Sequence, residues 1–79
     1  MIQLTMCIKA GDEAFRAGYM IAFNYDEQTV EDLKRLVPHT EREYYPASKQ
    51  WWVSIRFESV LNRLFGNFDA LVHLQGKLI

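Results

Sequence analysis

The stretch TEREYYPASKQWWVSI at positions 40–55 predicts a β-hairpin, and the other elements can be placed outward from it. The pattern alternates over 40–45 and again over 50–55, as expected for two short strands. Residues 46–49 interrupt it, and Pro46 suits an early turn position because its ring fixes φ. An Asn-Gly or Asp-Gly turn pair is missing. A loop of four residues or more is therefore expected, with the register open by one residue.

Amphipathic helices are expected on both sides of this hairpin. Before it, Asp26 is a suitable N-cap for a helix that runs to about Val37, because a carboxylate accepts hydrogen bonds from the free N–H groups of a first turn. Pro38 lies just past its end. After the hairpin, six apolar residues recur at helical spacing and predict a second helix that ends at Gly66 or Asn67. These residues are Phe57, Val60, Leu61, Leu64, Phe65 and Phe68.

Three further segments are expected to be strands. Residues 2–8 alternate cleanly, and residues 18–23 follow after a short connection, which favours an antiparallel pair. Residues 70–74 form a last short apolar run, and residues 76–79 are expected to fray or to pair weakly. The order β-β-α-β-β-α-β predicts a two-layer α+β fold, with a small and mainly antiparallel sheet covered by two helices. We expect residues 1–79 to form a single domain.

Composition limits the class of protein. The chain has 79 residues, of which 49% are hydrophobic and 14% aromatic, so it is expected to fold rather than to stay disordered. It is too short for a nucleotide-driven motor, which favours a binding or accessory role. A cytoplasmic location is expected, because Cys7 is the single cysteine and Met1 is not followed by a signal-peptide pattern. No apolar stretch approaches the ~20 residues of a membrane span.

Catalytic and metal-binding patterns are missing from the sequence. His39 and His73 are the two histidines and lie in different elements, and Cys7 stands alone within a strand. No spacing fits a zinc site, a phosphate-binding loop or a nucleophile turn. We therefore expect a protein that is not an enzyme and that needs no metal or cofactor.

Charge is distributed unevenly, although the net charge is −1. Residues 1–33 hold two basic and six acidic side chains, whereas residues 34–63 hold six basic and three acidic ones. The middle of the chain is thus cationic. Such a region attracts phosphates, modestly and in a way that salt screens, although an ordinary solvated surface is the simpler interpretation.

Two adjacent tryptophans suggest where a ligand binds. Trp51 and Trp52 must point to opposite faces of the sheet, because side chains alternate along a strand. Trp51 shares its face with other apolar residues and is the core candidate, so Trp52 is expected on the surface. An exposed indole beside cations can stack on bases of single-stranded nucleic acid, and it equally suits a protein interface. Packing of Trp52 under the N-terminal strands or against a dimer mate is the remaining alternative.

The expected nucleic-acid-binding residues are Lys34, Arg35, Arg42, Tyr44, Lys49, Trp52 and Arg56. The ligand in this hypothesis is DNA, single-stranded or forked, with RNA left open. The alternative is a small protein-interaction or self-associating protein, of the kind encoded by mobile elements or viruses, that uses the same hairpin or the apolar C-terminal segment.

Residues 20–65 also resemble a known family. The matching positions are Phe23, Tyr25, Asp26, Val30, Leu33, Lys34, Tyr44, Pro46, Lys49, Trp51 and Val53. They are similar to the HARP-like (HepA-related protein) module of annealing helicases of the Swi/Snf class, although Glu43 and Tyr45 depart from its usual residues. The resemblance implies a helicase-accessory domain that contacts structured DNA and has no ATP hydrolysis of its own.

Overall fold

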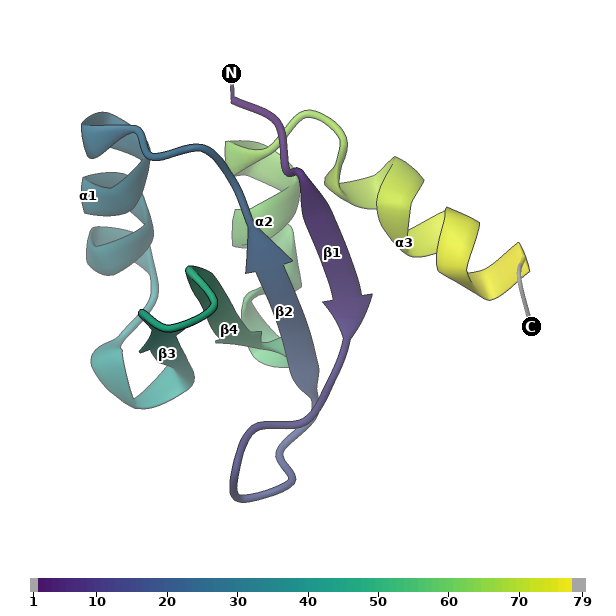
Figure 1. Cartoon of the computed structure of the whole chain (residues 1–79), viewed down its shortest axis with the longest axis horizontal. Coiled ribbons are helices and arrows are strands. Elements are labelled where there is room, and N and C mark those ends of the chain that lie inside the picture. Colours follow the sequence, from purple (N-terminus) through teal and green to yellow (C-terminus); the bar gives the residue numbers. More distant parts are fainter. Residues whose placement is uncertain (1, 78–79) are drawn as a thin grey trace.

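The computed structural model describes residues 2–77 and confirms an α+β fold built on a four-stranded antiparallel sheet. The sheet order is β1-β2-β4-β3, so β2 and β4 are central and β1 and β3 are edges (Figure 1). Short 3-10 turns precede β3 (η1, His39–Glu41) and α2 (η2, Ile55–Phe57). The main elements are β1 (Met6–Lys9), β2 (Gly18–Ala22), α1 (Glu27–Leu36), β3 (Arg42–Tyr45), β4 (Gln50–Ser54), α2 (Glu58–Leu64) and α3 (Phe68–Lys77).

The predicted hairpin is present as β3 and β4. Tyr45 pairs with Gln50, which leaves residues 46–49 as the loop and confirms the expected length. Lys49 closes this loop with a φ of 56°, in the left-handed region that only a few per cent of non-glycine residues adopt. Strand β4 then pairs along its other side with β2, so that Tyr19 lies opposite Val53.

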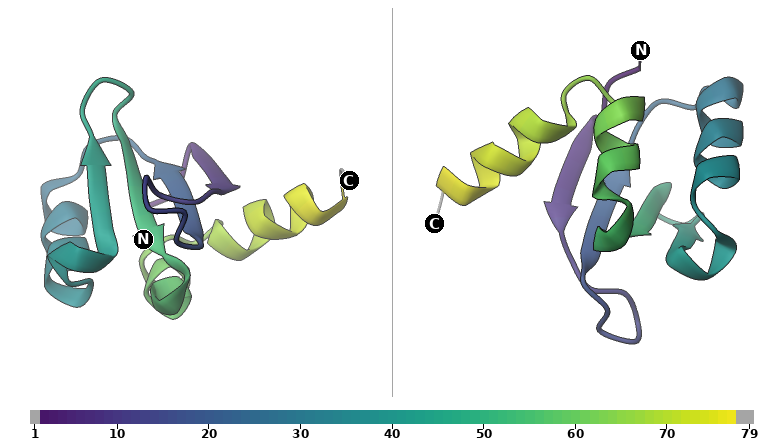
Figure 2. Two further views of the ribbon diagram at one scale, coloured as in Figure 1. Left: turned by 90° about the horizontal axis from the view of Figure 1, so that it is seen from below. Right: turned by 180° about the vertical axis from the view of Figure 1, so that it is seen from behind.

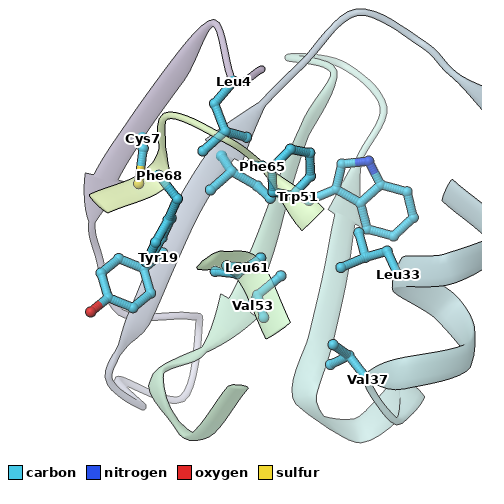
Figure 3. Close-up of a cluster of buried hydrophobic side chains, with 11 residues drawn as sticks. Leu4, Cys7, Tyr19, Leu33, Val37, Trp51, Val53, Leu61, Phe65 and Phe68 are labelled. Atoms are coloured by element: carbon cyan, nitrogen blue, oxygen red, sulfur yellow. The ribbon is translucent and has the colours of Figure 1, made fainter. Parts of the chain in front are cut away.

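The three helices of the described residues cover one face of the sheet, and Figure 2 shows α2 lying in front of the strands, roughly along them, when the molecule is seen from behind. Tyr19 of β2 meets Phe68 of α3 edge-to-face, with ring centroids 5.1 Å apart. Figure 3 shows how strand and helix side chains meet in the core. The buried core residues are Leu4, Cys7, Tyr19, Ile21, Leu33, Val37, Trp51, Val53, Leu61, Phe65 and Phe68.

Helix α1 begins where the sequence predicts. The carboxylate of Asp26 accepts hydrogen bonds from the backbone N–H of Thr29 at 2.9 Å and from its hydroxyl at 2.6 Å. These two donors lower the pKa of Asp26, because they stabilise its ionised form. The chain leaves the helix at Val37, which is extended and fully buried.

The C-terminal segment differs from the prediction. Residues 70–74 are not a strand, because they lie within α3. Phe65 interrupts the apolar stripe with an extended backbone, so α2 ends at Leu64 and a new helix starts at Phe68. Asn67 lies in this break and bonds both the N–H and the carbonyl of Leu4, at 2.8 and 2.9 Å. The expectation for residues 78–79 lies outside the described residues.

Candidate functional site

A cavity of about 490 Å³ lies between α1 and the β3–β4 hairpin. The described residues that line it are four aromatic residues, three cationic residues and one valine, with no carboxylate among them. All of these residues fall between positions 23 and 51, on the side of α1 that Figure 1 shows next to β3 and β4. The lining residues are Phe23, Tyr25, Val30, Lys34, Arg42, Tyr44, Lys49 and Trp51.

The hairpin supplies two aromatic rings that contact each other at a tilt. Tyr44 and Trp51 are direct partners across β3 and β4, so both side chains leave the same face of the sheet. Their ring centroids are 4.7 Å apart, with the planes inclined at 45°. Trp51 is 8% exposed and Tyr44 43% exposed. In Figure 3 the indole of Trp51 reaches toward α1 and lies beside Leu33.

The opposite wall comes from the chain before and within α1. Phe23 follows β2 and packs on Phe65, with ring centroids 5.0 Å apart. Tyr25 precedes the helix cap and is 79% exposed. Val30 and Lys34 are four residues apart, so they share one side of the helix. The N-cap residue Asp26 sets where α1 begins, and so it helps to position Tyr25, Val30 and Lys34 along this wall.

Three cations converge on the cavity from three different segments. Lys34 comes from α1, Arg42 from β3 and Lys49 from the hairpin loop. The Nε of Arg42 donates to the carbonyl of Val37 at 3.0 Å, which holds the guanidinium in place. Among residues 2–73, no ion pair engages any of these three side chains. Their charges are thus not neutralised by neighbouring carboxylates.

The structure brings four of the seven predicted site residues together: Lys34, Arg42, Tyr44 and Lys49 line the cavity. Arg35 and Arg56 do not. Arg35 turns to Asp32, with a 2.7 Å ion pair, and Arg56 lies 3.5 Å from Glu41. Both of these arginines are exposed and stand outside the cavity.

The expectation that Trp52 is exposed is wrong, because its side chain is 0% exposed. It does point away from Trp51, as alternation requires, but residues 10–17 fold over it. Its indole Nε1–H donates to the carbonyl of Ala10 at 3.0 Å, and the guanidinium of Arg16 lies 5.0 Å from its ring centroid. The buried indole of Trp52 therefore cannot stack on a base.

Four lining residues were not predicted as site residues: Phe23, Tyr25, Val30 and Trp51. All four are among the positions that carry the resemblance to the HARP-like module. That resemblance was the signal from which they could have been chosen. Trp51 was assigned to the core, correctly, but its ring also forms part of the cavity wall.

Other chemistry is sparse in the part of the chain that the structure describes. Within it, no group of three His, Cys, Asp or Glu side chains is arranged to hold a metal ion. Among the described helices, none has the length and apolar character to cross a bilayer. Burial raises the pKa of the Cys7 thiol to about 11, which disfavours the reactive thiolate.

No family model, curated protein or solved structure matches this chain. The resemblance of residues 20–65 to the HARP-like module therefore rests on the residues quoted for it.

Proposed function

We propose that this chain is a small non-catalytic nucleic-acid-binding module that receives an unpaired base in the cavity between α1 and the β3–β4 hairpin. The observation that carries the proposal is the composition of that cavity, in which aromatic walls are combined with Lys34, Arg42 and Lys49, and in which no described lining residue is acidic. Aromatic rings stack on bases of any sequence, for about 1–3 kcal/mol per base, and the cations hold the phosphates.

The charge of the cavity also selects against other ligands that aromatic rings bind. Aromatic cages commonly hold quaternary ammonium groups, but three cations in the wall would repel such a ligand. A ligand that has both a planar ring and a separate negatively charged group fits the aromatic walls and the three cations. Nucleotides have this combination of groups.

The resemblance to the HARP-like module supports the same proposal. Seven of the residues that carry it line the cavity, although they are spread from Phe23 to Trp51 along the chain. In helicases with this module, DNA recognition is separate from ATP hydrolysis. We infer an accessory role of that kind, with DNA that is single-stranded or forked as the ligand.

The test is an anisotropy titration with labelled single-stranded DNA, forked DNA, duplex DNA and single-stranded RNA. Three phosphate contacts predict a salt slope of about −2 for a single strand, which is roughly a 20-fold loss of affinity between 50 and 200 mM salt. Duplex DNA is expected to bind more weakly than the single strand, because its bases are stacked. Absence of binding to all four ligands at 50 mM salt would refute the proposal.

A matched pair of variants locates the interface. Lys34→Gln and Arg35→Gln remove the same charge from adjacent positions in the last turn of α1, but only Lys34 lines the cavity. Lys34→Gln is expected to weaken binding several-fold and to reduce the salt slope by about 0.7. Arg35→Gln should change both much less. Equal losses in the two variants would mean that binding depends only on overall charge.

A second candidate function, a protein interaction, is favoured by Phe15. This residue lies in the loop between β1 and β2 with a φ of 62° and a side chain that is 92% exposed. A large apolar residue in a strained and exposed position contributes little to folding, which suggests a role in binding. Sedimentation of the wild type and of Phe15→Ser tests self-association through Phe15. A wild type that stays monomeric at high concentration would argue against self-association.

A further inference from the structure

We propose that the cavity is a one-nucleotide site: it binds the base and the phosphate of a single nucleotide, and a free nucleoside monophosphate occupies it with a preference for purines. This inference rests on the proposed function and names its smallest ligand.

The size of the cavity sets the ligand unit. A volume of about 490 Å³ lies within the range of small-molecule sites, which run from roughly 300 to 1,000 Å³. Grooves that follow the backbone of a single strand contact about 4–16 nucleotides in each OB fold. Four aromatic rings of this chain gather instead around one compact cavity, which fits one base and its phosphate.

The rings offer a stacking surface and few groups to read a base edge. Tyr44 is 43% exposed and contacts Trp51 at a tilt of 45°, so part of its ring is accessible to a base. Tyr25 is 79% exposed on the other side of the cavity. Among the described residues, no Asn, Gln, Asp or Glu side chain lines the wall, so the side chains that read the edges of adenine and cytosine are missing from it. Stacking area then decides the preference, and it favours the larger purines.

Arg42 is the expected phosphate-binding residue, because only one of its three guanidinium nitrogens is hydrogen-bonded within the described residues. Its Nε is bonded to the carbonyl of Val37, and in the described part of the chain its two terminal nitrogens have no partner. A guanidinium presents such paired nitrogens to phosphate oxygens as a fork. Lys34 and Lys49 add charge from two other sides of the cavity. A ligand that lacks the phosphate would lose these contacts.

Calorimetric titration of the wild-type chain with AMP, CMP, adenosine and inorganic phosphate tests the inference. AMP is expected to bind several-fold more tightly than CMP, and about tenfold or more tightly than adenosine, which lacks the charged group. Inorganic phosphate alone should bind weakest. Lys34→Gln should weaken AMP binding, and the Arg35→Gln control should not. AMP should also displace labelled single-stranded DNA from the wild type.

The outcomes separate this inference from the proposed function. If the labelled strand binds but millimolar AMP neither binds nor displaces it, the one-nucleotide site is wrong and nucleic-acid binding stands. If AMP binds and no strand does, the nucleotide site stands and the proposed function falls. If inorganic phosphate binds as well as AMP, the cavity is an anion site and the inference is overturned.

Discussion

Substitution of Gly18 by alanine is expected to destabilise the fold strongly, because the Trp52 indole lies directly against this glycine. A Cβ at position 18 would lie 2.6 Å from ring carbons Cε2 and Cζ2 of Trp52 and 2.5 Å from the carbonyl oxygen of Val53. Neither neighbour can move easily. The indole is 0% exposed and is held by its bond to Ala10, and the carbonyl belongs to the central strand β4.

The magnitude follows from two opposing effects. Overpacking of a tight site costs about 1–3 kcal/mol, and a clash with backbone as well as with a fixed ring places Gly18→Ala at the upper end. Alanine reduces the conformational freedom of the unfolded chain, which offsets about 0.4–1 kcal/mol. The net loss is about 2 kcal/mol. Domains of this size rarely exceed about 3–5 kcal/mol in stability, so the variant should be close to unfolding.

Urea unfolding followed by far-ultraviolet circular dichroism measures this loss, and Gly11→Ala is its control. At Gly11 the nearest atoms to an added Cβ are 3.4–3.5 Å away, which is ordinary van der Waals contact. That variant should stay within about 0.5 kcal/mol of the wild type. If both variants unfold at the same urea concentration as the wild type, the placement of Trp52 against β2 is wrong.

Two further predictions concern the loop before β2 and the start of α1. Phe15→Gly should be more stable than Phe15→Ala by roughly 0.5–1 kcal/mol in urea unfolding, because both lose the exposed ring but only glycine accepts a φ of 62° without strain; equal stabilities would contradict the left-handed backbone. The lowered pKa of Asp26 means that its ionised cap stabilises the fold above the unfolded pKa of about 4, and that this contribution is lost as pH falls through the folded pKa. Thermal unfolding between pH 6 and pH 2.5 should therefore show a larger loss for the wild type than for Asp26→Asn, whereas parallel curves would exclude this role.

Local signals in the sequence were sufficient for most of the fold. The Asp26 cap, the residue 46–49 loop and the α+β class each depend on neighbouring residues, and the structure has all three. The prediction of a strand at residues 70–74 was wrong, because a short apolar run fits a strand and a buried helix equally well. Tertiary contacts decide it: α3 starts after the Asn67 break and packs Phe68 onto β2.

The sequence predicted four of the residues that line the candidate site, but it did not predict how they are arranged around the cavity. Alternation correctly separated Trp51 from Trp52, but it could not reveal that residues 10–17 cover the second indole, since that contact joins segments far apart in the sequence. Arg35 was included with Lys34, although adjacent residues on a helix do not share a face. The cavity itself arises from the packing of α1 beside the hairpin, which no local pattern specifies.

The position of β3 at the edge of the sheet has a consequence for the motions of this protein. Strand β3 carries Arg42 and Tyr44 and is hydrogen-bonded to a neighbouring strand along one side only. Edge strands open locally at lower free energy than the whole fold. A ligand bound to both Arg42 and Tyr44 would suppress this opening. The backbone amides of β3 would then exchange with deuterium more slowly as the ligand concentration rises.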